Sequence, residues 1–112
     1  MDIEVQDLPA GITKVILRGR FDTTGAVAIE LQLNTAASER PALVVDLSEV
    51  SFLSSYGIRV LLLGAKIAKS RRAKLVILCP DSHVGKVLRT AGMHELIPVF
   101  QRQDAALAAL GT

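Results

Sequence analysis

The sequence has 112 residues, of which 50% are hydrophobic, 4% aromatic and 21% charged. This length fits one domain spanning residues 1–112, and the apolar content excludes an intrinsically disordered chain. The net charge of +2 is too small to argue for nucleic acid, and the single cysteine excludes an internal disulfide and multi-cysteine metal motifs. No apolar run approaches the roughly 18–20 residues that span a bilayer, and the first residues lack a signal-peptide pattern. We therefore expect a soluble, cytoplasmic, single-domain protein.

The first half of the chain is expected to form a hairpin, a helix and a buried strand. Residues Ile3–Val5 and Ile12–Arg20 are rich in β-branched side chains and lie close together in the chain, which predicts two antiparallel strands. A helix is predicted over Ala26–Ser38, after a cap at Asp22 and its neighbours, although the apolar residues there alternate as in a strand. The continuous apolar run Ala42–Leu47 is typical of a central strand covered on both faces.

The second half of the chain alternates helices with strands. The pattern predicts a helix over Tyr56–Ser70, a buried strand over Lys74–Cys79, a helix from a cap at Asp81 and Ser82 to about Thr90, an edge strand over Ile97–Phe100 and a terminal helix over Asp104–Leu110. The expected fold class is therefore α/β: one mixed sheet, made of the N-terminal hairpin plus parallel strands, with about four α-helices and right-handed crossovers.

The segment from Asp46 to Ile58 carries the most functional information. It is expected to lead from the buried strand through a short loop to two hydroxyls, Ser54 and Ser55, at a helix N-terminus. Unpaired backbone N–H groups and the helix dipole favour negative charge there, so a phosphate on one of these hydroxyls would be stabilised and would change the surface charge. Serine is also a common helix N-cap that needs no further role, and the spacing alone leaves both interpretations open.

The same segment resembles the signature of STAS domains, the family of bacterial anti-sigma factor antagonists, which is roughly Asp-Leu-Ser-x-Val-x-Phe-Met/Leu-Asp-Ser-Ser/Thr-Gly-Leu/Ile. The matching residues are Asp46, Leu47, Ser48, Val50, Phe52, Leu53, Ser55, Gly57 and Ile58. Residues Leu17–Asp22 and the pairs Val87-Leu88 and Gly92-Met93 resemble two further motifs, so the resemblance extends over nearly the whole chain. Two positions depart from the signature, because Ser54 replaces its Asp and Tyr56 replaces its Ser or Thr.

The resemblance implies a STAS-like regulatory protein that is not an enzyme and needs no cofactor. In antagonists of this family, an anti-sigma factor that is also an ATP-binding serine kinase phosphorylates the serine that maps to Ser55. The unphosphorylated form binds the kinase and frees the sigma factor, and a metal-dependent phosphatase restores that form. The departures at Ser54 and Tyr56 leave an alternative open: an unphosphorylated accessory subunit of another complex, such as the ATPase of an ABC transporter. Both a monomer and a weak homodimer fit the sequence.

The helix over Tyr56–Ser70 is predicted to have two apolar faces. The face expected against the sheet consists of Ile58, Leu61, Leu62, Ala65 and Ala68. The other face, Tyr56, Val60, Leu63 and Ile67, is expected on the far side, where it is either buried under a neighbouring helix or exposed as a docking ridge beside Ser55, with Gly64 allowing close approach. The residues expected to bind the partner are Asp22, Thr23, Ser54, Tyr56, Gly57, Arg59, Val60, Leu63 and Ile67.

The remaining polar residues form no motif for catalysis or metal binding. His83 and His94 lack a metal-ligand spacing with Cys79, which is expected to be an apolar filler at a strand end. There is no Gly-x-Ser-x-Gly elbow, Gly-x-Gly-x-x-Gly motif or P-loop. The basic cluster Lys69–Lys74 lacks the aromatic residues of a nucleic-acid patch and is expected to complement a helix C-terminus instead.

Overall fold

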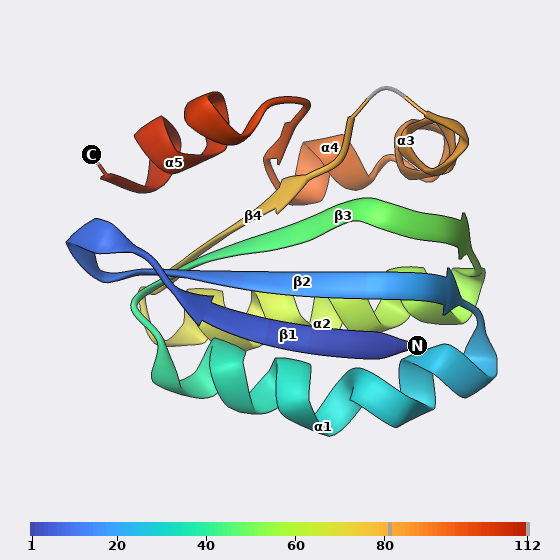
Figure 1. The fold of residues 1–112 in the computed structure, drawn as a ribbon, viewed down its shortest axis with the longest axis horizontal. Coiled ribbons are helices and arrows are strands. Elements are labelled where there is room, and N and C mark those ends of the chain that lie inside the picture. Colours follow the sequence, from blue (N-terminus) through green and yellow to red (C-terminus); the bar gives the residue numbers. More distant parts are fainter. Residues whose placement is uncertain (81, 112) are drawn as a thin grey trace.

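The computed structural model describes residues 1–80 and 82–111, which form a five-stranded sheet with helices packed on it (Figure 1). The strands are β1 (Asp2–Asp7), β2 (Ile12–Phe21), β3 (Ala42–Leu53), β4 (Lys74–Leu78) and β5 (Val99–Phe100). The helices are α1 (Thr23–Glu39), α2 (Ser55–Ser70), α3 (His83–Thr90), α4 (Met93–Leu96) and α5 (Gln103–Gly111), and a short 3-10 turn, η1 (Pro9–Gly11), joins β1 to β2.

The strands lie in the sheet in the order of the chain, β1-β2-β3-β4-β5. β1 pairs antiparallel with β2, and each later strand is parallel to the one before it. Parallel neighbours need a crossover connection, which α1, α2 and the pair α3–α4 provide in turn. The predicted α/β class, N-terminal hairpin and parallel strands are therefore confirmed.

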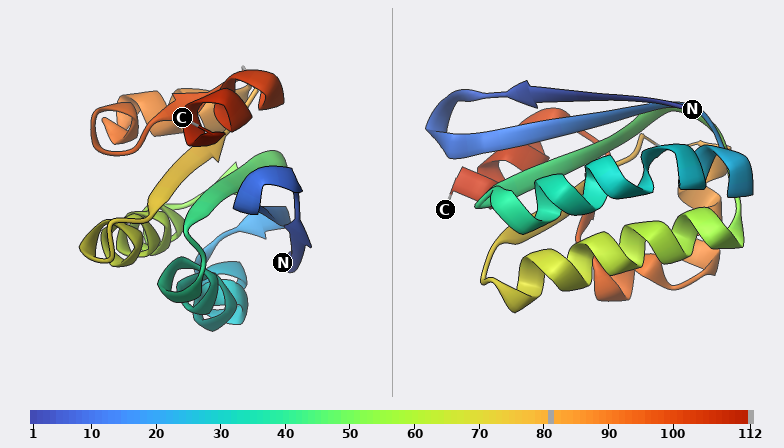
Figure 2. Two further views of the ribbon diagram at one scale, coloured as in Figure 1. Left: turned by 90° about the vertical axis from the view of Figure 1, so that its left-hand side faces the viewer. Right: turned by 90° about the horizontal axis from the view of Figure 1, so that it is seen from below.

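Two apolar clusters lie on the two faces of the sheet because successive strand residues point to opposite sides. The larger cluster joins residues such as Val45 and Ile77 to the buried sides of α1, α2, α3 and α4. The smaller cluster joins Val44 and Val76 to α5. Figure 2 shows this division directly, with α1 and α2 on one side of the sheet and α5 on the other.

β3 is longer than the apolar run predicted, and this corrects the expected loop after Leu47. The strand continues to Leu53, which pairs with Phe21 at the end of β2 after two register shifts between the strands. Ser51 is exposed and has no partner in β2 at the second register shift, and this extra residue brings Val50 and Leu53, which are three positions apart, to the same buried face. As a result, β3 delivers the chain directly to the start of α2.

The second correction concerns the helices near the C-terminus. Residues Met93–Leu96 form the additional short helix α4, which follows Gly92 in a left-handed conformation with φ 73°. A single turn of helix is too short to show a periodic pattern, so the sequence did not predict it. Ser82 caps α3 as expected, by accepting a hydrogen bond from the Gly85 N–H, whereas Asp81 lies outside the described residues.

Candidate functional site

The N-termini of α1 and α2 lie side by side at one end of the sheet (Figure 1). They meet there because β2 and β3 are parallel and end in register, with Phe21 opposite Leu53. The backbone N–H of Ser54 donates to the Phe21 carbonyl oxygen at 3.0 Å, which joins the residue before α2 to the end of β2. The structure thus brings together the residues at positions 22–23 and 54–57, which were predicted as site residues from two separate segments of the sequence.

The two adjacent serines occupy different environments. Ser54 is the N-cap of α2: its hydroxyl donates to the Phe21 carbonyl oxygen at 2.9 Å and accepts from the Gly57 N–H at 3.1 Å. Ser55 is the first residue of the helix and is exposed, and its hydroxyl makes no side-chain hydrogen bond within residues 1–80 and 82–111. Of the two serines, only Ser55 therefore presents a hydroxyl that a second protein can reach without breaking the helix cap.

Asp22 is the N-cap of α1, as the sequence predicted. Its carboxylate accepts from the Gly25 N–H at 2.8 Å, and this hydrogen bond, with Arg20 3.6 Å away, holds the pKa of Asp22 below its ordinary value. Arg20 also stacks over the Phe52 ring, with its guanidinium carbon 4.4 Å from the ring centroid. Asp22 consequently contributes fixed negative charge beside the exposed Thr23, at the same end of the sheet as the start of α2.

The buried face of α2 differs from the predicted one. Its fully buried residues are Gly57, Val60, Leu61, Gly64 and Ala68, whereas Ile58, Leu62 and Ala65 are half-buried. A Cβ on Gly57 would lie 2.8 Å from the Phe21 carbonyl oxygen, so this glycine allows α2 to approach β2 closely. Val60 belongs to the same core face, which corrects its expected place on the far side. Gly57 has no side chain and the side chain of Val60 is buried, so neither residue offers a side chain to a partner.

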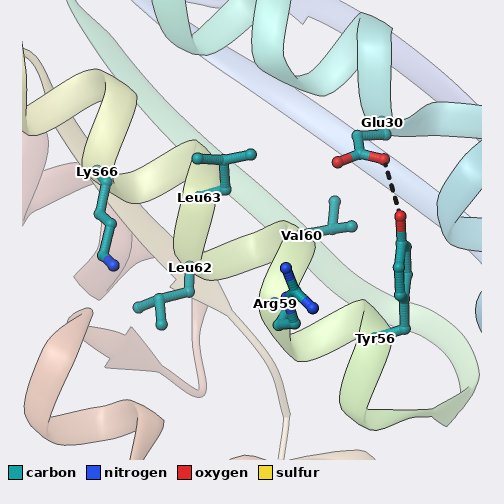
Figure 3. A pocket seen from close by; sticks show the side chains of 7 residues that line it. All are labelled: Glu30, Tyr56, Arg59, Val60, Leu62, Leu63 and Lys66. Carbon is teal, nitrogen blue, oxygen red and sulfur yellow. Dashed lines mark hydrogen bonds between the residues drawn. The ribbon is translucent and has the colours of Figure 1, made fainter.

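The rest of the predicted ridge faces α1 and solvent. The hydroxyl of Tyr56 lies 3.3 Å from a carboxylate oxygen of Glu30 and thereby links the two helices, as Figure 3 shows. Ile67 is half-buried, and Leu63 is 42% exposed. Gly64 lies against the Leu33 side chain of α1, so the close approach expected there is between the two helices of this chain.

An open hollow of about 210 Å³ lies along the side of α2 that faces α1 and solvent (Figure 3). Its lining consists of Glu30, Tyr56, Arg59, Val60, Leu62, Leu63 and Lys66. Arg59 and Lys66 are both exposed and form no salt bridge with any residue that the structure describes. They lie on either side of Leu63 along the helix, so α2 presents an apolar side chain between two uncompensated positive charges. We call Arg59, Leu63 and Lys66 the α2 ridge.

Glu30 and Lys66, which line the hollow, were not among the predicted site residues, and neither was Arg71 at the opposite end of α2. Glu30 could have been noticed because it is the only charged residue between positions 23 and 38. Arg71 donates to the carbonyl oxygens of Ala37 and Arg40 at 2.9 and 3.3 Å, so part of the basic cluster does complement a helix C-terminus, namely that of α1. Sequence spacing alone does not indicate that the Arg71 side chain bonds the C-terminus of α1 rather than that of α2, the helix that it follows.

No residues in the described part of the chain form a metal site, since no group of three metal-ligating side chains converges there. His83 and His94 are exposed, while Cys79 is buried, which raises the pKa of its thiol and keeps it protonated. Among the described helices, none has both the length and the apolar content needed to cross a bilayer. The chemistry available at the α1–α2 end is therefore a reachable hydroxyl beside charged and apolar contact groups.

Comparisons with known proteins agree with this geometry. Residues 6–98 match the family model described as "Mlab, STAS domain". The chain is 30% identical over 103 residues to BtrV of Bordetella bronchiseptica, a protein named as an anti-sigma factor antagonist, and the match covers 91% of this chain and 89% of BtrV. The crystal structure of an anti-sigma factor antagonist from Mycobacterium paratuberculosis superimposes with a TM-score of 0.91 at 25% identity, covering 99% of this chain and 94% of that one.

The fold is also similar to that of a protein with lower sequence identity. The structure of the Bacillus cell fate determinant SpoIIAA in its phosphorylated form superimposes with a TM-score of 0.71 at 15% identity, covering 96% of this chain and 99% of SpoIIAA.

Proposed function

This chain belongs to the STAS domain family and to its anti-sigma factor antagonists, and we propose that it binds an anti-sigma factor serine kinase and is released by phosphorylation of Ser55. A phosphoserine phosphatase would return it to the binding form. The protein then acts in the cytoplasm by reversible binding, with no catalytic step of its own. SpoIIAA, which shares the fold and has been determined in a phosphorylated form, supports a switch of this kind.

The contrast between Ser54 and Ser55 carries the proposal. A kinase needs a hydroxyl that is exposed and not committed to the fold, and Ser55 meets both requirements while Ser54 caps α2. The first-turn N–H groups of α2 and the positive end of its dipole favour the added phosphate, so the fold tolerates the modification.

Phosphorylation would also change the charge of the α2 ridge, where we propose that the partner binds. Arg59 lies four residues after Ser55, the spacing at which helix side chains pair, and it has no salt bridge within the part of the chain that the structure describes. A phosphate carries about −1.5 to −2 charges, so it would neutralise Arg59 and place negative charge next to Leu63. A partner that binds the α2 ridge through its own carboxylates would then meet repulsion.

An accessory subunit that is never phosphorylated is the second candidate. Two observations favour it: Ser54 replaces the acidic residue of the signature, and Tyr56 is held by Glu30 next to the proposed kinase site. Both functions require an ATP-binding partner and an exposed α2 ridge, so the identity of the partner and the state of Ser55 separate them.

A native pull-down followed by mass spectrometry tests the proposal. The wild-type chain should recover a serine kinase of the anti-sigma factor class, with part of the bait carrying a phosphate on Ser55. Leu63→Asp is the matched control bait, because it changes the ridge at a side chain that is 42% exposed. Recovery of a transporter ATPase with unmodified Ser55 contradicts the proposal in favour of the second candidate.

A further inference from the structure

Between Thr23 and Ser38 the outer face of α1 carries no charge, and it exposes two large hydrophobic side chains. Val27 is 61% and Leu31 is 78% exposed, one turn apart on the helix. Around them lie the small, exposed residues Thr24, Ala28 and Thr35. An outward face of a surface helix is normally rich in charges, whereas the outward faces of α2 and α3 here carry Arg59, Lys66, Lys69 and Lys86. Exposed apolar patches of this kind mark interaction surfaces.

This face is separate from the α2 ridge. Glu30 on α1 points towards α2 and bonds Tyr56, whereas Leu31 lines a second hollow, of about 340 Å³, on the side of β1. That hollow includes Val5 of β1, which is itself 42% exposed and extends the apolar surface, while Glu39 and Arg40 line its end at the C-terminus of α1. Seen from below in Figure 2, α1 and α2 run next to each other across the front of the molecule, so the outer face of α1 is open to a second body.

We infer that the outer face of α1 binds a second copy of this chain. A face without charges selects an equally uncharged surface, because a charged one would lose its hydration without gaining a partner. The face is also complementary to itself in size. When two α1 helices run antiparallel about a twofold axis between Ile29 and Glu30, Leu31 of each copy lies over the small Ala28 of the other, and Thr24 lies over Thr35. Antiparallel helix dipoles favour this arrangement.

The contact is expected to be weak and reversible. It consists chiefly of one helix of about 25 Å from each copy, which places it at the low end of specific interface sizes. Self-association is independent of the phosphorylation proposed for Ser55, which lies on the other helix.

Sedimentation equilibrium over roughly 5–500 µM tests the inference, since a small interface gives dissociation constants in this range. The wild type should show a monomer–dimer equilibrium, and Leu31→Glu should raise the dissociation constant at least about tenfold. Leu96→Glu is the matched control: Leu96 is 62% exposed on α4, away from α1, and its replacement should leave the equilibrium unchanged. Circular dichroism of each variant verifies that the fold is retained.

A mixing experiment tests the register. Ala28→Lys alone should also weaken self-association, whereas an equimolar mixture of the Leu31→Glu and Ala28→Lys chains should form a heterodimer at low salt, because the introduced carboxylate of one chain then faces the introduced ammonium group of the other. A wild type that stays monomeric throughout, or that dimerises as tightly with Leu31→Glu, overturns the inference. Failure of the mixture to associate overturns the antiparallel register.

Discussion

At the scale of single residues, the neighbouring Ser54 and Ser55 differ in what their hydroxyls do. Ser54 satisfies a donor of the first turn of α2 and ties the helix to β2, whereas Ser55 contributes no side-chain hydrogen bond to the described structure. The same atoms that make Ser54 structural make it a poor substrate for a kinase, because phosphorylation would remove the proton that its hydroxyl donates to the Phe21 carbonyl oxygen. Ser55, where we propose phosphorylation, therefore has no side-chain hydrogen bond to lose within the described residues.

This division predicts different stabilities for two alanine variants. Ser54→Ala should lower the free energy of unfolding by about 1 kcal/mol, since it removes a helix N-cap. Ser55→Ala should change it by no more than about 0.5 kcal/mol, as expected for an exposed residue without partners. Urea unfolding followed by circular dichroism measures both values. Equal losses for the two variants would contradict the assignment of Ser54 as the cap.

A second residue-scale prediction concerns the end of α2. Arg72 has a left-handed backbone, with φ 61°, and the N–H groups of Arg72 and Ala73 donate to the carbonyl oxygens of Lys69 and Ala68, as in a Schellman cap. A side chain at this position costs about 1 kcal/mol relative to glycine. Arg72→Gly should therefore raise the free energy of unfolding by up to about 1 kcal/mol in a urea titration. Arg71→Gly, at a position with negative φ, is the control and should destabilise.

At the scale of elements, α2 combines a core face with an exposed ridge. Periodicity predicted an amphipathic helix over almost its observed length. Leu61 and Ala68 are buried as it predicted, but Val60 is buried as well, because apolar residues surround most of this helix. The contact with α1 decides the orientation: Val60 and Gly64 face inward, and only Leu63 of the predicted outer stripe remains largely accessible.

The helix orientation predicts opposite outcomes for two aspartate substitutions. Leu63→Asp should leave the free energy of unfolding within about 1 kcal/mol of wild type, because the side chain is 42% exposed. It should nevertheless weaken binding of the partner at the α2 ridge. Val60→Asp places an unpaired charge at a site that is 2% exposed and should cost more than about 3 kcal/mol. Thermal melts and a binding titration separate the two effects, and unfolding of Leu63→Asp would show that the ridge is structural.

The N-terminus of α1 predicts a pH dependence. Accepting the Gly25 N–H lowers the pKa of Asp22 in the folded state, so this carboxylate stabilises the fold above its unfolded pKa of about 3.9. The contribution is lost as the pH falls through the lower, folded pKa. Between about pH 6 and about pH 3, wild type should therefore lose more stability than Asp22→Asn, since asparagine keeps the cap but does not titrate. Urea titrations at each pH measure the difference, and parallel losses would contradict it.

At the scale of the whole molecule, the sequence predicted the order of strands and helices, and the fold follows from it. The short turn between β1 and β2 favours their antiparallel pairing. The continuous apolar runs of β3 and β4 predict that helices cover both faces of the sheet. Contacts between distant segments could not be predicted: Arg71 on the carbonyls of α1, Glu30 on Tyr56, and the extension of β3 to Leu53 all depend on which elements become neighbours. Exposure within the candidate site could not be predicted either: periodicity placed Val60 on the outer side of α2, where the structure buries it.

The central claim is that Ser55 is the position at which a kinase switches this protein. The kinase recovered by the pull-down, incubated with labelled ATP, tests it most directly. Wild type and Ser54→Ala should both incorporate phosphate, because the Ser55 hydroxyl remains reachable in each, and Ser55→Ala should incorporate none. Undiminished labelling of Ser55→Ala would contradict the account.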